Sequence, residues 1–296
     1  MTAVSTEVVT IADARFFELM RVAFGSLRSF GGLPDDAKLA VYDFGLKADQ
    51  RASCQAMGID IRRIEAPYPA AVWALERRFA LWVAKTWAIW DAARWPQDSR
   101  SVVIFFDTDM AVLDVPQASD YCQRVIEAAL SADGPVAVPD LWTFQETTMY
   151  ALDGDDARDA NFWTRWFNCD LRAAMTWNIG LIAGRPEVLR GLYAPWQSWV
   201  LKWGDPDSTL AQAFSPVCID QLAFSALSAT GVFGHPMALP VEMNFTRPMW
   251  TKWPERIRDA QAIHLTGAIK PWQAAGVYHP MTLRWKRVAD KLGVTP

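Results

Sequence analysis

Two acidic residues, Asp107 and Asp109, directly follow the apolar run of residues 102–106. The β-branched and aromatic side chains of this run predict a buried parallel strand. In open α/β sheets, ligands bind beyond the carboxyl ends of the strands. Alternate residues of an extended segment face the same way, so both carboxylates can reach one cation, and oxygen donors suit Mg²⁺, Mn²⁺ or Ca²⁺. The spacing therefore predicts a metal site, with a solvated strand end as the alternative.

A second group of polar residues lies near the carboxyl terminus. His264, Gly267 and Lys270 follow one another at three-residue intervals before Pro271-Trp272. An imidazole can complete the shell of a metal ion, while a backbone N–H at Gly267 and the Lys270 ammonium can hold a phosphate. The alternative for His264, one of three histidines in the chain, is an ordinary core position.

Strands and helices alternate along the first part of the chain. Strands are predicted over residues 7–11, 38–42, 60–64 and 102–106, and helices over residues 16–27, 47–57 and 70–95. This order predicts an α/β fold with right-handed crossovers. The sequence has no Gly-x-Gly-x-x-Gly and no Gly-Lys-Ser/Thr loop, so a dinucleotide oxidoreductase and a P-loop enzyme both lose support.

The second half of the chain has a less regular pattern. We expect helices over 117–130 and 186–202, strands over 136–138 and 175–183, and a helix that begins near Asp220-Gln221. Asn178 and Gly180 interrupt the 175–183 strand, and a glycine inside a strand often marks the close approach of a ligand or another backbone. Capping of its own helix is the alternative role for Asp220. A calcium-binding loop begun at Asp153 would need Gly and Glu where the chain has Arg158 and Thr164, so residues 153–159 are expected to be a solvated loop.

The composition restricts the class of protein. A net charge of −4 over 296 residues argues against nucleic-acid binding, which needs a basic face. The four cysteines are far apart and are expected to be free, buried thiols. Most of the 16 tryptophans should lie in the core, although aromatic faces also stack on sugar rings.

The two ends of the chain carry further expectations. The amino-terminal residues include Glu7 and form no apolar signal region, which leads us to expect a cytoplasmic protein. Residues 283–287 open a basic amphipathic helix. This helix either packs as a terminal helix or makes peripheral contact with an anionic membrane surface.

Taken together and in this order, these segments resemble glycosyltransferase family 8, whose members are retaining, metal-dependent enzymes with the GT-A nucleotide-diphospho-sugar transferase fold. The likeness rests on Asp107-Thr108-Asp109, Asn178-Ile179-Gly180, Asp220-Gln221 and His264-x-x-Gly267-x-x-Lys270-Pro271-Trp272. It implies an α/β fold with a mixed, mostly parallel sheet flanked by helices. It also implies one domain over residues 1–296, with a nucleotide-binding half (1–115), a sugar and acceptor half (116–280) and a C-terminal helix (281–296).

The resemblance implies a role for each motif. Asp107, Asp109 and His264 would bind Mn²⁺, with Mg²⁺ as the alternative, and this ion and Lys270 would stabilise charge on the leaving diphosphate. Ala12 and Asp13 would recognise uracil, with Phe17 stacked on the base. The residues implied to contact the nucleotide sugar are Ala12, Asp13, Phe17, Lys85, Asp107, Thr108, Asp109, Asn178, Gly180, Gly267 and Lys270. The implied catalytic residues are Asp220, Gln221 and Lys270.

The implied reaction moves a hexose from UDP-glucose or UDP-galactose, with retention of configuration, to a glycan, a lipid-linked glycan, a protein or a small molecule. One alternative is a non-catalytic sugar-nucleotide-binding module of the same fold. Another is a phosphohydrolase of the haloacid dehalogenase type, in which Asp-x-Asp also follows a strand. Its pattern requires Thr or Val where this chain has Ala111, and it leaves the His264 to Trp272 motif unexplained.

Overall fold

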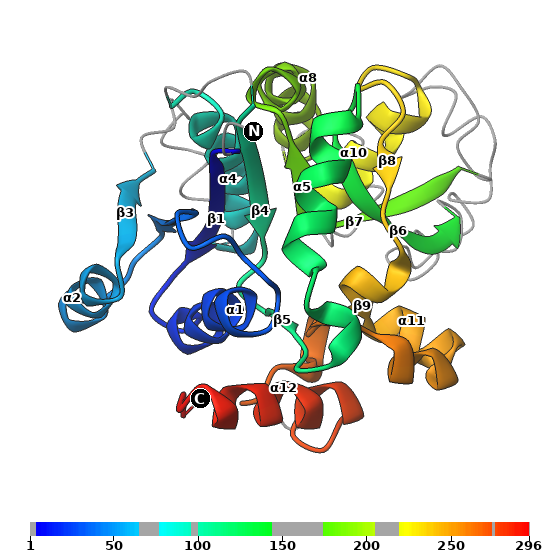
Figure 1. Ribbon diagram of the computed structural model, residues 1–296. Helices are drawn as coiled ribbons and strands as arrows, with labels where there is room; N and C mark the ends of the chain where they lie inside the picture. The colour runs from blue at the N-terminus through cyan, green and yellow to red at the C-terminus, as the bar shows by residue number, and fades with distance from the viewer. Residues whose placement is uncertain are drawn as a thin grey trace.

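The computed structural model describes residues 4–64, 77–95, 100–143, 174–204, 219–273 and 276–295. Within these residues the main element is a seven-stranded sheet with the order β3-β2-β1-β4-β7-β6-β8. Helices pack on both of its faces (Figure 1). A smaller sheet of three strands has the order β5-β10-β9. The predicted α/β fold with a mainly parallel sheet flanked by helices is confirmed.

The first half alternates strands and helices, as predicted. Its elements are β1 (Thr6–Ala12), α1 (Phe17–Ser29), β2 (Lys38–Asp43), α2 (Ala48–Ala56), β3 (Ile59–Arg63), α4 (Arg77–Ala92) and β4 (Val102–Phe106). β1 pairs in parallel with β2 and β4, and β2 pairs in parallel with β3. The carboxyl ends of these four strands therefore share one edge of the sheet. Residues 70–76 of the predicted third helix lie outside the described residues.

The middle of the chain departs from the prediction at two places. Its elements are β5 (Met110–Val112), η1 (Pro116–Ala118), α5 (Tyr121–Ser131), β6 (Val136–Thr143), β7 (Met175–Gly184), α8 (Pro186–Gly204), α10 (Ile219–Ala229) and β8 (Met237–Ala238). The helix predicted from residue 117 begins only at Tyr121, because Pro116 starts a separate 3-10 turn. The strand predicted over 136–138 continues to Thr143. Its register with β7 shifts between Ala137 and Val138 and again between Pro139 and Thr143, and proline has no N–H to donate to the hydrogen bonds of a sheet.

The last part of the chain returns to the end of β4. Its elements are η3 (Val241–Asn244), β9 (Phe245–Thr246), α11 (Arg247–Lys252), η4 (Pro254–Asp259), β10 (Ala262–His264), η5 (Gly267–Ile269) and α12 (Pro280–Lys291). β10 pairs antiparallel with β5, so that His264 lies opposite Met110. This pairing brings a C-terminal histidine beside the segment that immediately follows Asp109.

Two apolar cores lie on the two faces of the main sheet. Because successive side chains of a strand point to opposite faces, β1 contributes to both: Val8 and Ala12 pack in the core that contains α1, and Val9 and Ile11 in the core that contains α4. β7 runs antiparallel to β4 and β6 between them. The strand ends that carry the candidate site residues are thus held from both sides.

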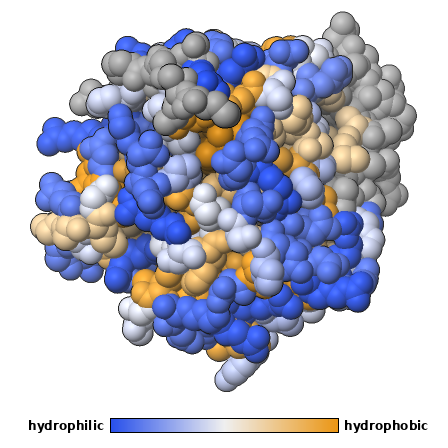
Figure 2. Space-filling view, viewed as in Figure 1, coloured by the Kyte–Doolittle hydropathy of each residue, from blue (hydrophilic) through white to orange (hydrophobic). Residues whose placement is uncertain are grey.

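The C-terminal helix α12 packs on the molecule. Met281, Trp285, Val288 and Ala289 are buried on its inner side, where it contacts α1, β5 and β10. Hydrophilic side chains dominate the lower edge of the molecule in Figure 2, where α12 lies. Because its apolar side is used in packing, a membrane contact through α12 would have to rest largely on its basic residues.

Membrane-spanning helices, cysteines and the acidic loop can be assessed only over the described residues. Among the described helices, none combines the length and the apolar character that a transmembrane helix requires. Cys54 and Cys122 are buried free thiols, as predicted, and burial raises the pKa of Cys122 to about 12. Cys169, Cys218 and the acidic residues 153–159 lie outside the described residues.

Candidate active site

The structure brings the three predicted metal ligands together. One ligand atom each from Asp107, Asp109 and His264 lies within 4.8 Å of the others. His264 Nε2 is 3.1 Å from Asp109 Oδ1 and 3.7 Å from Asp107 Oδ2. Two carboxylates and an imidazole form a donor set that suits Mn²⁺, since it offers both oxygen and nitrogen ligands. Within the described part of the chain, this is the cluster of side chains that meets the requirements of a metal site.

Backbone hydrogen bonds fix the segment between the two carboxylates. The Asp107 N–H donates to the Gly180 carbonyl of β7 at 2.8 Å, and the Met110 N–H donates to the Asp107 carbonyl at 3.1 Å, which closes a turn around Thr108. The Leu265 N–H donates to the Asp109 carbonyl at 2.9 Å. The turn is therefore held by β7 on one side and by the end of β10 on the other.

Two asparagines orient the His264 ring through hydrogen bonds. Nδ1 lies 3.2 Å from Asn178 Oδ1 and 3.1 Å from Asn244 Oδ1. The Asn178 oxygen also accepts from Asn244 Nδ2 at 2.7 Å and from the Gly180 N–H at 3.0 Å, which identifies it as an acceptor. Nδ1 therefore carries a proton, and Nε2 is the ring nitrogen that faces the two carboxylates, where its lone pair would bind a metal ion.

Gly180 makes room for this ring. A Cβ at residue 180 would lie 2.5 Å from His264 Cε1 and 2.6 Å from Nδ1, closer than real Cβ contacts allow. The glycine that interrupts the predicted strand thus marks the close approach of a side chain from β10. Gly180 positions a candidate metal ligand, His264, and Asn178 does so through its hydrogen bond.

Two lysines neutralise the buried carboxylates. Lys85 Nζ lies 3.1 Å from Asp107 Oδ2 and 3.3 Å from Asp220 Oδ2, so it joins the metal-site segment to the start of α10. Lys270 Nζ contacts Asp109 and donates to the Leu265 carbonyl. The site thus holds two fixed positive charges beside three carboxylates.

The pKa values reflect burial and these charges. Burial raises the pKa of Asp107, although the Lys85 charge opposes it. Burial alone would also raise the pKa of Asp109, but the charges of Lys270 and His264 outweigh it and hold that pKa well below its usual range. Burial alone would lower the pKa of Lys85, yet the Asp107 and Asp220 carboxylates outweigh it and raise the pKa. Lys85 therefore remains a cation.

Asp140 and Asn244 belong to the site but were missed by the sequence analysis. Asp140, on β6, is buried and accepts a hydrogen bond from Gln221 Nε2 at 2.8 Å. Thr246 Oγ1 lies 3.5 Å from its other oxygen, and burial raises the pKa of Asp140. Asp140 could have been predicted from the sequence, because it follows a short apolar run as Asp107 does. Asn244 carries no local signal, because its role depends on a histidine from another strand.

Asp13 and Ala12 lie at the end of β1, as predicted, and both are 1% exposed. Asp13 Oδ1 accepts from the Arg15 N–H at 2.8 Å and the Phe16 N–H at 3.1 Å, so it also stabilises the turn before α1. Gly267 begins η5 with a φ of 62°, a backbone conformation that favours glycine.

Phe17, the aromatic residue predicted to stack on the base, lies in the core of the structure. Phe17 is 5% exposed and packs in the core, so the structure does not offer its ring to a ligand. Phe16 is half-buried and contacts the Trp272 ring edge to face, with 5.6 Å between centroids. Trp272 is itself 50% exposed. The accessible aromatic pair next to Asp13 is therefore Phe16 and Trp272.

The fold and its sheet order define the class of structure: the chain has the GT-A fold of glycosyltransferases. The galactosyltransferase LgtC, solved in complex with donor and acceptor sugar analogs, matches with a TM-score of 0.63 at 16% identity, over 98% of this chain and 97% of that chain. The bifunctional glycosyltransferase WbbM gives 0.58 at 14% identity, over 97% of this chain and 52% of that one. Mouse xyloside xylosyltransferase 1 gives 0.52 at 11% identity, over 88% and 97%.

No protein-family model matches the sequence, and neither does any curated protein. The solved structures therefore establish the fold, since their sequences are too distant to carry a function across. What the chain does has to be argued from the residues at the strand ends.

Proposed function

We propose that this chain is a metal-dependent glycosyltransferase that moves a hexose from a nucleotide-diphosphate sugar, UDP-glucose or UDP-galactose, to a saccharide acceptor with retention of configuration. The observation that carries the proposal is the convergence of Asp107, Asp109 and His264 at the ligand-binding edge of a GT-A fold. The solved structure of LgtC with donor and acceptor sugar analogs supports it by analogy of fold.

The metal site fits Mn²⁺, with Mg²⁺ as the alternative, and such an ion would supply Lewis acidity at the leaving phosphate oxygen. The residues of this chain supply the remaining charge. Lys270 is buried and reaches Asp109, so its ammonium can move from that carboxylate to a phosphate oxygen of the donor. A positive charge at that oxygen in a buried site favours the transition state, in which negative charge grows on the leaving group.

The sugar would lie near α10, where Asp220 and Gln221 begin the helix. Both side chains are restrained: Asp220 by Lys85, and Gln221 by Asp140. Rigid polar groups of this kind can orient a sugar ring through its hydroxyls. Retention is proposed from the family resemblance, with Asp220 and Gln221 as the candidates closest to the reacting carbon.

The base would lie at the end of β1. We propose that Asp13 lies beside the base there, as the resemblance implies, and that the aromatic pair Phe16 and Trp272, in place of Phe17, forms the wall against the base. This assignment is supported by exposure: Phe16 is half-buried and Trp272 is 50% exposed, whereas Phe17 is 5% exposed.

The test is hydrolysis and transfer of UDP-glucose and UDP-galactose by wild-type protein and by Asp109→Asn, each with saturating Mn²⁺ and with EDTA. We expect Mn²⁺-dependent release of UDP by the wild type and a loss of at least about 100-fold in the variant, because one ligand of the ion is replaced. Full activity of Asp109→Asn would contradict the proposal. Binding without turnover would identify a non-catalytic module, and release of inorganic phosphate a phosphohydrolase.

A further inference from the structure

A pocket of about 520 Å³ lies between β3 and α4, apart from the strand ends that carry the metal site. Its lining residues come from these two elements and from the turn that follows α4. They are Asp60, Ile61, Arg62, Arg63, Trp87, Trp90, Asp91, Arg94 and Trp95. The volume lies in the range of small-molecule sites. β3 is the edge strand of the main sheet, which leaves this flank of the sheet without a further strand.

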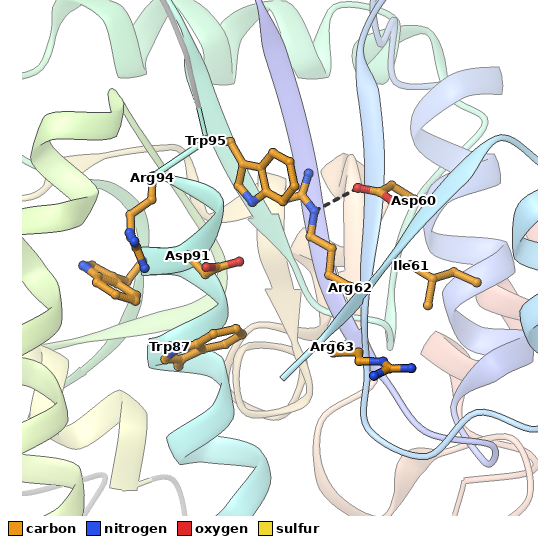
Figure 3. Close-up of a pocket in the computed structure, with 9 residues that line it drawn as sticks. Asp60, Ile61, Arg62, Arg63, Trp87, Asp91, Arg94 and Trp95 are labelled. Atoms are coloured by element: carbon orange, nitrogen blue, oxygen red, sulfur yellow. Dashed lines mark hydrogen bonds and ion pairs between the residues drawn. The ribbon is translucent and has the colours of Figure 1, made fainter. Parts of the chain in front are cut away.

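Polar contacts hold the walls of the pocket. Arg62 extends from β3 to the Trp95 ring, with its guanidinium carbon 4.4 Å from the ring centroid (Figure 3). It pairs with the Glu7 carboxylate and with Asp60 at 3.0 Å. On the facing helix, Asp91 accepts from the Tyr42 hydroxyl at 2.8 Å. The side chains that define the pocket are thus held in place, as a binding site requires.

Aromatic surface is the second property of the pocket. Trp95 is 48% exposed although Arg62 lies over its ring. Figure 3 shows Trp87 and Trp95 on opposite sides of Asp91; Trp87 is 5% exposed, so the ring that a ligand can reach is that of Trp95. Such surfaces accept the C–H faces of sugar rings, while neighbouring carboxylates and guanidinium groups can bond hydroxyls.

The charges of the lining indicate a neutral ligand. Two carboxylates, Glu7 and Asp60, already balance Arg62. Arg94 lies over the Trp90 ring, with 4.5 Å between the guanidinium carbon and the centroid. The buried guanidinium of the lining, that of Arg62, is therefore engaged, while Arg63 and Arg94 are exposed, where salt screens their attraction to an anion. A neutral polyol needs no such free cation.

We propose that this pocket is a second carbohydrate-binding site, which holds part of a neutral saccharide acceptor away from the reaction centre. That the ligand is an acceptor rests on the proposed function; that the pocket binds a saccharide does not. α4 links the two sites, because Lys85 and Asp91 lie about 9 Å apart along its axis. An acceptor held here would raise its effective concentration at the metal site.

The experiment measures binding of lactose, maltotriose, cellotriose and tri-N-acetylchitotriose to the full-length protein by calorimetry and NMR, in EDTA. We expect at least one of them to bind, Trp95→Ala to weaken that binding at least tenfold, and Asp60→Ala to weaken it several-fold. Asp60 is half-exposed in its side chain, so its variant should fold even if Trp95→Ala does not. Tyr278→Ala, which removes another exposed aromatic residue, is the matched control and should bind as the wild type does.

Donor hydrolysis separates this proposal from the proposed function. Trp95→Ala should hydrolyse UDP-glucose or UDP-galactose with Mn²⁺ as the wild type does. If the wild type hydrolyses neither donor but saccharide binding depends on Trp95, the proposed function fails and the second site stands. If hydrolysis is present and no saccharide binds, or binding is unchanged in both pocket variants, the second site is overturned. Binding of inorganic phosphate in place of a saccharide would also overturn it.

Discussion

The His264 imidazole packs directly against the α-carbon of Gly180, so that a Cβ there would lie 2.6 Å from Nδ1. The same ring nitrogen faces the oxygens of Asn178 and Asn244. Van der Waals contact on one side and hydrogen bonds on the other leave the ring one orientation. The position of the candidate metal ligand from β10 is thus fixed in part by β7, a strand that contributes no candidate ligand itself.

Gly180→Ala should therefore weaken Mn²⁺ binding. The added methyl displaces the His264 ring, and loss of such a supporting contact typically costs about 10- to 100-fold in metal affinity. Calorimetric titration with Mn²⁺ measures the effect. The control is Gly191→Ala, where a Cβ meets nothing within 4 Å on α8; it should bind Mn²⁺ normally and gain up to about 1 kcal/mol in unfolding free energy. Equal Mn²⁺ affinity for both variants would show that Gly180 is not needed to position the His264 ring.

Lys85→Met should destabilise the metal-free protein. Lys85 pairs with Asp107 and Asp220 in a largely buried site, and loss of one partner of a buried ion pair costs about 3–5 kcal/mol. Urea unfolding in EDTA measures the loss, and added Mn²⁺ should restore part of it by replacing a cation beside Asp107.

The matched control for Lys85 is Lys291→Met, which removes an exposed pair with Asp114. Surface pairs contribute about 0–1 kcal/mol. If both lysine variants lose the same stability, or if Mn²⁺ restores none in Lys85→Met, the role assigned to Lys85 is wrong.

Lys270→Met should change two affinities in opposite directions. Without nucleotide, Lys270 contacts Asp109 and competes with a metal ion for that carboxylate, so the variant should bind Mn²⁺ several-fold more tightly. With Mn²⁺ present, the variant should bind UDP at least about tenfold more weakly, because a charge-assisted bond to phosphate is lost. Electron paramagnetic resonance of free Mn²⁺ and calorimetry of UDP binding measure the two effects. Weaker binding of Mn²⁺ alone would show that Lys270 supports the ion instead of competing with it.

Asp140→Asn should stabilise the metal-free protein at neutral pH. Burial raises the pKa of Asp140 in the folded state, so the wild-type carboxyl contributes stability below its unfolded-state pKa and loses it as the pH rises through the folded-state pKa. The neutral amide undergoes no such loss. The variant's unfolding free energy should exceed that of the wild type by about 1.4 kcal/mol for each unit of pKa shift. This difference should be absent near pH 3 and complete at pH 7. Urea unfolding from pH 3 to pH 7 in EDTA measures the difference in unfolding free energy. A difference that decreases towards neutral pH would contradict the raised pKa of Asp140.

Much of the fold could be predicted because its strands are short apolar runs separated by helical patterns. The carboxylates at 107 and 109 could be found because they end such a run, and His264 because it opens a spaced motif. Asn244 could not, because its partner comes from another strand. Phe16 and Phe17 are adjacent at the start of one helical pattern, so periodicity alone did not decide which one faces the core; the structure buries Phe17. The extension of β6 was missed because Pro139 is normally a strand terminator.

The pairing of β5 with β10 has a consequence for how the protein is made. A ribosome delivers the chain from its amino end, so both carboxylates leave the tunnel long before the imidazole that completes their set. A nascent or C-terminally shortened protein without β10 would lack both that third ligand and the strand that anchors it. Binding of an ion by all three proposed ligands would therefore require that the chain has been made at least through β10.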